Sequence, residues 1–375
     1  MTTTETDSRR LRLGTRGSRL ALTQSGQVAE ALIASGGGGA AAAAGKASEG
    51  SGGLSIDLVT VRTDGDGDRT PLRQLGGVGV FAARLRHALL DGEVDLVVHS
   101  FKDLPTQPVE GLEVICVPPR EDPRDALCAR DGLTLADLPE GARVGTGSPR
   151  RAAQLLAARP DLEVVDLRGN VPTRLARVRG LETVGVGTDE PVAPSRADAA
   201  GDLDAVVLAL SGLRRLGLEH CASEVLDLET MLPAPAQGAL AVEARADEDS
   251  AELARAAAAL DDEPTRLAVT AERALMTRLG AGCAAPVGAW AYLREGSQAP
   301  RVLVLRAVVT SLDGGQEVGC ELSTELPEAS GGPGAPGDTA AVRAAEALGV
   351  RAAEVLLDDG ADQIVDLHAN KPRRH

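Results

Sequence analysis

Short apolar runs alternate with amphipathic segments along the first two thirds of the chain. Six runs have the length and apolar content of strands: residues 11–15, 54–62, 94–99, 143–146, 162–167 and 204–210. Four intervening segments place apolar side chains at helical spacing: residues 18–34, 81–90, 149–158 and 172–179. Strands that alternate with helices in this way predict α/β structure, with a parallel sheet covered by helices on both faces.

The pattern changes after about residue 261. A long helical pattern over residues 266–279 is followed by three strand patterns without helices between them, at 286–292, 302–311 and 317–323. A last helical pattern covers residues 339–357. This order predicts an antiparallel sheet with helices packed on it, an α+β domain. Three segments rich in Gly, Ala, Pro or Asp read as loops: residues 36–53, 183–201 and 325–338.

Composition narrows the function classes. The 375 residues suffice for two or three domains, and the net charge of −16 argues against a nucleic acid or an anionic membrane as partner. One Trp, one Tyr and two Phe argue against base recognition by aromatic stacking. No run approaches the ~20 apolar residues of a membrane span, and the polar start is unlike a secretory signal. We therefore expect a protein that binds neither a nucleic acid nor a membrane.

The five cysteines favour a reducing compartment. They are odd in number, far apart and never spaced as C-x-x-C, which argues against a disulfide framework or a zinc ribbon. We expect a cytoplasmic protein without a metal site. Cys116, Cys128 and Cys320 lie in apolar strand patterns and are expected to be inert core residues. Cys283 lies in a Gly-rich loop after a helix, which suits a modified thiol and a packed one equally.

Arginines gather at several turns between strands and helices. In Gly-Thr-Gly-Ser-Pro-Arg-Arg, residues 145–151, Ser148 suits an N-cap and Pro149 the first helical position. Arg150 and Arg151 then oppose the helix dipole, which makes sense if an anion neutralises them. Residues 13–18 and 166–174 repeat this chemistry, and residues 143–179 contain eight Arg against three acids. A cleft with this excess of positive charge fits a small polyanion. The alternative is that these arginines are merely solvated, because the chain uses Arg for nearly all of its basic residues and has only three Lys.

The run Val-His-Ser-Phe-Lys-Asp-Leu-Pro, residues 98–105, follows a buried strand pattern. It places Lys102 and Asp103 at the end of that strand, where ligands of α/β sheets bind. A partly desolvated Asp near cations can act as a general acid and base. An ordinary Lys–Asp surface pair is the alternative, and His99, flanked by apolar residues, is expected to be structural.

Together these segments resemble the porphobilinogen deaminase (hydroxymethylbilane synthase) family. The matching runs are ordered and spread over nearly the whole chain: LGTRGSRLAL (13–22), VHSFKDLP (98–105), EDPRDA (121–126), VGTGSPRR (144–151), LRGNVPTR (167–174), LSGLRRLGL (210–218), QGA (237–239) and CAAPV (283–287). Each run is weakly specific, but the set is highly specific.

The resemblance implies two α/β domains like those of type II periplasmic binding proteins, with a cleft between them, and a smaller C-terminal α+β domain. Residues 1–118 with 237–258 would form the first domain, which contains the insertion 36–53. Residues 122–232 would form the second, and residues 262–375 the third. The chain would return to the first domain near Gln237.

The resemblance also implies the chemistry. A dipyrromethane cofactor would be attached to Cys283 through a thioether, and four porphobilinogen molecules would be joined to it head to tail with release of ammonia. Asp103 matches the catalytic aspartate. Residues of the matching runs would bind the carboxylates of cofactor and substrate: Arg16, Ser18, Ser100, Lys102, Thr146, Ser148, Arg150, Arg151, Arg168, Gly169, Arg174 and Gln237. The enzyme would be a cytoplasmic monomer, and the product would pass to the next enzyme.

Three positions depart from the family pattern. Val78 replaces a Lys in a Gly-rich loop, Gly147 replaces a Ser, and the loop Thr-Asp-Gly-Asp at residues 63–66 aligns ambiguously. Two other classes stay open from the residues alone. A non-catalytic clamshell module that binds small polyanions would need neither Asp103 nor a modified Cys283, and a cysteine-nucleophile transferase would need a base beside Cys283.

Overall fold

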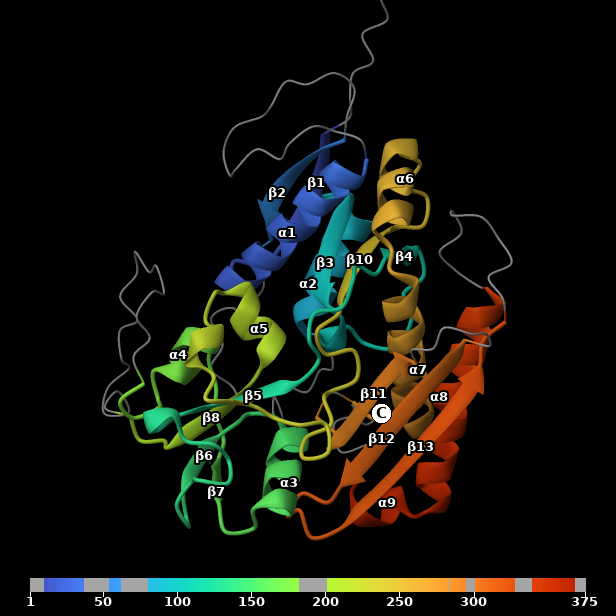
Figure 1. Ribbon diagram of the computed structural model, residues 1–375. Coiled ribbons are helices and arrows are strands. Elements are labelled where there is room, and N and C mark those ends of the chain that lie inside the picture. Colours follow the sequence, from blue (N-terminus) through green and yellow to red (C-terminus); the bar gives the residue numbers. More distant parts are fainter. Residues whose placement is uncertain are drawn as a thin grey trace, which may run out of the picture.

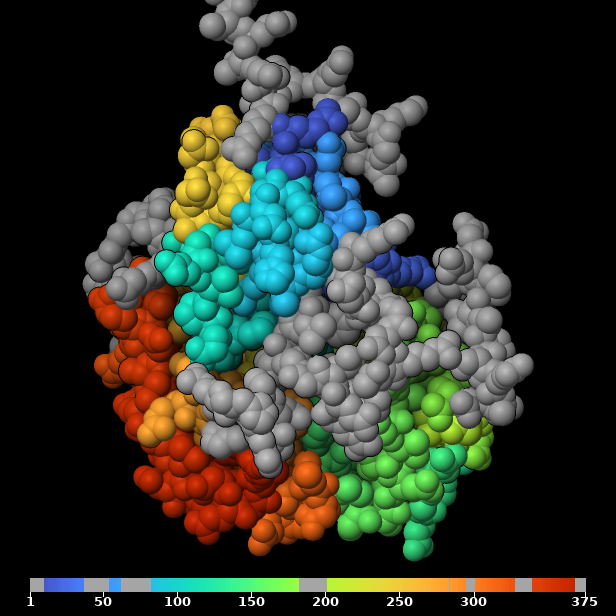
Figure 2. Space-filling model, turned by 180° about the vertical axis from the view of Figure 1, so that it is seen from behind, coloured from blue at the N-terminus to red at the C-terminus, as the bar shows by residue number. Residues whose placement is uncertain are grey.

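A computed structural model of the chain describes residues 10–36, 54–61, 80–181, 201–282, 284–294, 301–327 and 339–367. Three sheets organise these residues into a first, a second and a third unit (Figure 1). Seen from behind, the first unit in blue and cyan lies above the green second unit and the orange-red third unit (Figure 2). The predicted loops lie mostly outside the described residues, as do Val78 and residues 63–66.

The first unit has a five-stranded mixed sheet of order β2-β1-β3-β10-β4. Its strands are β1 (Arg10–Thr15), β2 (Ser55–Thr60), β3 (Leu96–Ser100), β4 (Leu112–Cys116) and β10 (Leu240–Arg245). The first three run parallel, whereas β10 is antiparallel to β3 and β4. Helices α1 (Arg19–Ser35) and α6 (Ala251–Leu260) pack on one face of the sheet and α2 (Val80–Leu90) on the other.

The second unit repeats this arrangement in the order β7-β6-β8-β5-β9. Strands β6 (Arg143–Gly145), β7 (Glu163–Val165) and β8 (Ala205–Ala209) are parallel, and β5 (Asp125–Ala129) is antiparallel to β8 and β9 (Glu224–Val225). The helices of this unit are α3 (Pro149–Ala158), α4 (Val171–Leu175) and α5 (Leu210–Arg215). Two 3₁₀ turns, η3 (Arg130–Gly132) after β5 and η4 (Glu219–Cys221) before β9, complete it. The α/β class is confirmed, but the prediction of purely parallel sheets was wrong.

The antiparallel strands mark the two places where the chain crosses between units. Strand β5 follows the first crossing, and β10 follows the return. Each inserts beside the last parallel strand of its sheet, so the two sheets have the same strand order. The domain boundaries given above stay predictions.

Helix α4 ends earlier than predicted. The pattern suggested a helix to residue 179, but Val178 forms a parallel bridge with Leu203. That bridge requires extended backbone, which stops the helix after Leu175.

The third unit confirms the α+β prediction. Its antiparallel sheet has the order β11 (Val287–Leu293), β12 (Val302–Thr310), β13 (Glu317–Glu325). One face packs on α7 (Glu263–Leu279) and α8 (Ala340–Asp358), with the short α9 (Ala361–Ile364) at the end. Gly349 allows the two long helices to approach closely, since a Cβ there would collide with the carbonyl oxygen of Ala271.

A buried carboxylate ties the third unit to both crossings. Glu272 of α7 is fully buried and pairs with Arg120 of the first crossing at 2.7 Å. It also accepts hydrogen bonds from the backbone N–H groups of Ala236, in the return crossing, at 2.5 Å and of Ala291 in β11 at 2.8 Å. Helix α7 therefore anchors the segments that join the first two units.

Candidate active site

Strand β3 ends in a short 3₁₀ turn, η2 (Phe101–Asp103). Phe101 is buried, Lys102 is half-buried and the side chain of Asp103 is exposed. Before the turn, the Ser100 hydroxyl and the buried amide of Gln24 on α1 are hydrogen-bonded at 3.1 Å. His99 is buried, with its Nε2 3.1 Å from Glu243, in agreement with the structural role expected for it.

The turn before α3 has the predicted caps. Ser148 is the N-cap residue, and its side chain accepts a hydrogen bond from the Arg151 N–H at 3.5 Å. Pro149 begins the helix. Thr146 is buried, and its hydroxyl accepts a hydrogen bond from the Ser148 N–H at 3.2 Å. At Gly147 a Cβ would collide with the carbonyl oxygen of Leu167, so in this chain the backbone leaves no room for the family's Ser.

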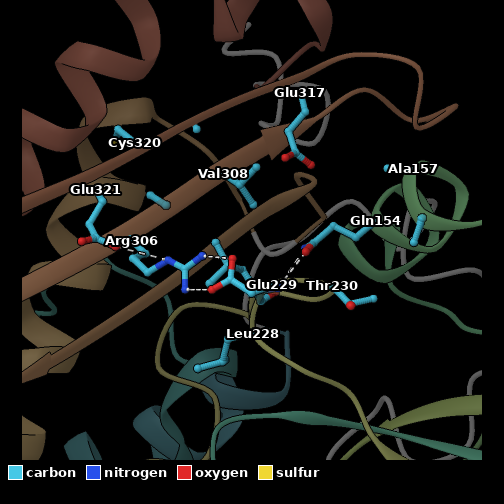
Figure 3. Close-up of a pocket in the computed structure, with 14 residues that line it drawn as sticks. Gln154, Ala157, Leu228, Glu229, Thr230, Arg306, Val308, Glu317, Cys320 and Glu321 are labelled. Atoms are coloured by element: carbon cyan, nitrogen blue, oxygen red, sulfur yellow. Dashed lines mark hydrogen bonds and ion pairs between the residues drawn. The ribbon is translucent and has the colours of Figure 1, made fainter. Parts of the chain in front are cut away.

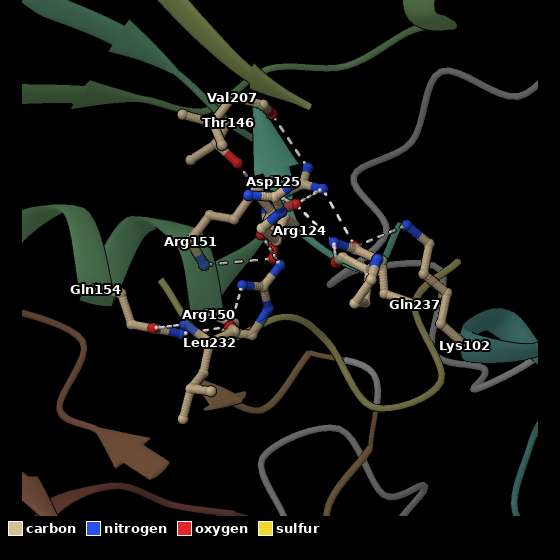
Figure 4. Close-up of polar contacts among 12 residues, drawn as sticks. Lys102, Arg124, Asp125, Thr146, Arg150, Arg151, Gln154, Val207, Leu232 and Gln237 are labelled. Carbon is tan, nitrogen blue, oxygen red and sulfur yellow. Dashed lines mark hydrogen bonds and ion pairs between the residues drawn. The ribbon is translucent and has the colours of Figure 1, made fainter. Parts of the chain in front are cut away.

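The two arginines of α3 are buried and share one carboxylate, Asp125 (Figure 4). Asp125 Oδ2 lies 2.7 Å from Arg150 Nη2, and Oδ1 lies 2.7 Å from Arg151 Nη2. The Nη1 atoms of Arg150 and Arg151 donate to the carbonyl oxygens of Leu232 and Val207, respectively. Burial would raise the pKa of Asp125, but the charges of both arginines hold it well below its usual range. The carboxylate of Asp125 thus neutralises part of the positive charge at the start of α3.

Gln237 connects this cluster to the first unit (Figure 4). The residue is fully buried, and its Nε2 donates to Asp125 Oδ1 at 2.8 Å and to the Pro123 carbonyl at 2.7 Å. Its Oε1 accepts from Lys102 Nζ at 3.2 Å and from Arg151 Nη2 at 3.4 Å. Because both amide hydrogens and both oxygen lone pairs are used, the side chain has one orientation. It brings the turn η2 into contact with the arginines of α3.

The arginines that follow β7 belong to the same electrostatic environment. Asn170 caps α4, and Gly169 turns the chain with a φ of +107°, where a Cβ would press on Thr173. Burial lowers the pKa of Arg174 to about 10; the like charges of Arg151 and Arg168 add to the shift, and Asp103 is among the acids that oppose it. Cations therefore outnumber acids around Asp103.

Lys102 has an ammonium group whose charge responds to its surroundings. Burial lowers the pKa of Lys102 to about 8, with Asp103 opposing the shift and Arg151 adding to it. We expect the rate at which an amine-reactive acylating reagent modifies Lys102 to increase with pH, with a midpoint near pH 8, because only the neutral amine reacts. Peptide mass spectrometry between pH 6 and 11 would follow it.

A polyanion in the site should move that midpoint upward, since it stabilises the ammonium form. A midpoint near 10.4, the ordinary lysine value, would contradict the environment described for Lys102.

Not every predicted residue comes together here. Lys102, Arg150, Arg151 and Gln237 form one network of hydrogen bonds and ion pairs with Asp125. Arg174 is near enough to feel the charges of Arg151 and Arg168, and its Nε donates to the Gly169 carbonyl. Ser18 caps α1 by accepting from the Ala21 N–H at 3.3 Å, and Arg16 is half-buried at the end of β1. Cys283 lies outside the described residues, in the connection between α7 and β11. Prediction missed Asp125 and Gln24, although Asp125 lies in the run EDPRDA.

Of the three cysteines predicted to be core residues, Cys116 and Cys128 are confirmed, whereas Cys320 is only partly buried. Cys116 and Cys128 are fully buried, and Cys320 is half-buried. Burial raises the pKa of Cys116 and Cys128 to about 12 and that of Cys320 to about 11. Thiolates, the nucleophilic form, are therefore scarce at these three positions.

A cavity of about 610 Å³ lies elsewhere, between α3 and the strands β12 and β13 (Figure 3). Arg306 in this cavity is paired with Glu229 at 2.7 Å and with Glu321 at 3.5 Å. The lining of the cavity contains neither Asp103 nor the arginines of the turns, although the carbonyl of Leu232 in that lining accepts a hydrogen bond from Arg150. Within the described residues, no helix is long and apolar enough to cross a bilayer, and no group of three or more His, Cys, Asp and Glu could hold a metal ion.

Comparison with known proteins adds independent information. The family model "Porphobilinogen deaminase, dipyromethane cofactor binding domain" matches residues 11–253, and "Porphobilinogen deaminase, C-terminal domain" matches residues 266–358. A porphobilinogen deaminase of Cutibacterium acnes is 52% identical and covers 97% of this chain and 99% of its own length. One of Micrococcus luteus is 51% identical, covering 94% and 93%.

The similarity to solved structures is weaker. A TRAP periplasmic solute binding protein from Roseobacter denitrificans, with bound β-D-glucuronate, covers 68% of this chain and 78% of its own, at 10% identity and a TM-score of 0.33.

Proposed function

The chain belongs to the porphobilinogen deaminase family, and we propose that its reaction takes place where the turn η2 meets the arginines of α3. The chain is a transferase, a hydroxymethylbilane synthase, that joins four porphobilinogen molecules head to tail with release of ammonia, on a dipyrromethane primer. The alternative of a binding module without catalysis is not supported by these relatives.

The residues at this place fit the dipyrromethane cofactor. Pyrroles of this class have acetate and propionate side chains, and the site offers Lys102, Arg150, Arg151 and Arg174 against the two carboxylates of Asp103 and Asp125. The Nε of Arg150 is buried without a hydrogen-bond partner among the described residues, so it can still donate. When bound, the cofactor supplies the pyrrole carbon to which the first substrate is joined.

The exposed Asp103 is the group we assign to proton transfer. No hydrogen bond to its carboxylate is formed within the described residues, and Lys102 lies beside it in the same turn. It would protonate the leaving amine and later accept a proton from the pyrrole carbon. Its negative charge would stabilise cationic character at the reacting pyrrole.

The positive groups would bind and orient carboxylates. Arg150 and Arg151 are held by Asp125 in fixed positions, which reduces the ordering cost of pairing with a ligand. Arg16, Arg168 and Arg174 would bind further carboxylates, and the polar groups of Ser18, Ser100, Thr146, Ser148 and Gly169 would complete the cradle. The observation that best supports this site is the Gln237 link between Lys102 and Arg151.

Intact-mass measurement tests the function. We expect freshly purified protein to have the mass of a covalent dipyrrole adduct, and Cys283→Ser to fold without it and without the pink colour that acidic aldehyde reagents develop. The control, Cys320→Ser, should keep the adduct because that thiol is half-buried in β13. An adduct on another cysteine would overturn the attachment site, and none on wild-type protein would overturn the function.

The setting of the enzyme is also part of the proposal. The dispersed cysteines support a cytoplasmic enzyme, and the net charge of −16 supports one with neither nucleic acid nor membrane as partner. The proposal includes a monomeric state. The enzyme would hand its product to the next enzyme. The two crossings, after which β5 and β10 enter their sheets, support three domains, at residues 1–118 with 237–258, 122–232 and 262–375.

A further inference from the structure

Arg273, on α7 of the third unit, reaches the turn η2 in the first unit. Its Nη1 donates to the carbonyl oxygens of Leu104 at 2.7 Å and Phe101 at 3.3 Å, and its Nη2 donates to that of Pro105 at 2.8 Å. The guanidinium carbon also lies 4.5 Å from the centre of the Phe101 ring. One side chain thus binds the backbone on both sides of Lys102 and Asp103.

The turn has little local support of its own. Inside it, one backbone hydrogen bond closes the 3₁₀ geometry, from the Leu104 N–H to the Phe101 carbonyl at 3.2 Å. Short 3₁₀ turns are weakly stable, because their hydrogen-bond geometry is poor. The planar guanidinium can donate to several carbonyls while stacking on an aromatic ring, which an ammonium group cannot do in the same geometry.

We propose that Arg273 is a positioning residue that fixes the turn bearing Asp103. The inference rests on the proposed role of Asp103 in proton transfer. Helix α7 ends at Leu279, four residues before Cys283, and its Glu272 binds both crossings. One helix therefore sets the position of the acid–base group relative to the connection that contains the cofactor cysteine.

The expected effect is on the chemical step. None of the hydrogen bonds of Arg273 described above involves the Asp103 carboxylate, so its loss should shift the turn rather than remove a reacting group. A displacement of about 1 Å at a reacting group costs on the order of 10²-fold in rate. We expect Arg273→Met to lower kcat about 10- to 100-fold, with little change in KM and with the covalent cofactor present.

The test is a double-mutant cycle with Asp103→Asn, measured on protein shown by mass to have its cofactor. If Arg273 acts through Asp103, adding Arg273→Met to Asp103→Asn should lower kcat by less than about threefold more. Arg273→Lys should recover part of the loss, since an ammonium can still donate to a carbonyl. The control is Arg278→Met on the same helix, which removes an exposed ion pair between Arg278 Nε and Glu354 Oε1, 3.2 Å apart. It should leave kcat unchanged.

Each outcome decides a different point. Additive losses in the cycle, or an equal loss in Arg278→Met, would overturn the inference, because Arg273 would then act through the general stability of α7. A near-normal Asp103→Asn would instead overturn the proposed role of Asp103. If Arg273→Met does not fold, the same cycle with Arg273→Lys gives the same decision.

Discussion

The Asp103→Asn variant should fold like the wild-type protein and lose about 10²- to 10⁴-fold in kcat, the span expected for a lost general acid–base group. Asn keeps the size of the side chain but can neither accept the pyrrole proton nor protonate the leaving amine. The described histidines do not offer a replacement at this place, because His99 is buried against Glu243, His87 lies within α2 and His220 lies in η4. Steady-state rates and intact mass would be measured together.

Two further variants sharpen this result. Asp103→Glu keeps the charge and should retain more activity, since only the placement of the carboxylate changes. Asp131→Asn alters a comparable residue, which lies in the turn η3 with a φ of +56°, a conformation that Asn also adopts. It should leave kcat unchanged. A near-normal rate for Asp103→Asn would exclude it as the acid–base group and direct attention to Lys102 or a bound water.

Elements with local signals could be predicted from the sequence. Helix α3 begins at Pro149 and ends at Ala158, as predicted, because a capping Ser, a Pro and apolar positions at helical spacing are all encoded within a dozen residues. Strands β5 and β10 could not be found in this way. Each gains its place from a partner strand about 80 or more residues away, β8 for β5 and β3 for β10. Their positions follow from the crossings.

The same distinction applies to the site. The dipole argument required an anion near Arg150 and Arg151 and took it to be a bound polyanion. It could not identify the carboxylate of Asp125, 25 residues upstream of Arg150, which the fold places there. That pairing exists because the first crossing places β5 next to β8, opposite the start of α3. Arg273 and the carbonyl of Phe101 are 172 residues apart, and nothing in their local sequences links them. The motifs therefore predict which residue types lie at the site, whereas the contacts between these residues follow only from the fold.

Loss of the Asp125 carboxylate should lower the stability of the folded protein strongly. Asp125→Asn would leave the guanidiniums of Arg150 and Arg151 buried without their counter-ion, and removal of one member of a buried ion pair costs about 3–5 kcal/mol. The variant should also bind its cofactor incompletely, because Asn replaces one of the two carboxylate oxygens that accept from Gln237 and the arginines with an NH2 donor. Urea unfolding followed by circular dichroism at pH 7 would measure the first effect, and intact mass the second.

The pH dependence of this loss separates charge from packing. The pKa of Asp125 in the folded protein lies below the ordinary value of about 3.9, so its stabilising contribution is complete above that value and declines as the pH falls below it. The difference in unfolding free energy between wild type and Asp125→Asn should therefore stay constant from pH 7 to about 5 and become smaller below pH 4. Asp202→Asn, which breaks a partly exposed pair with Arg177, is the matched control and should cost about 0–1 kcal/mol. A loss for Asp125→Asn no larger than that of the control, or a difference that does not narrow in acid, would show that Asp125 does not hold the two arginines by its charge.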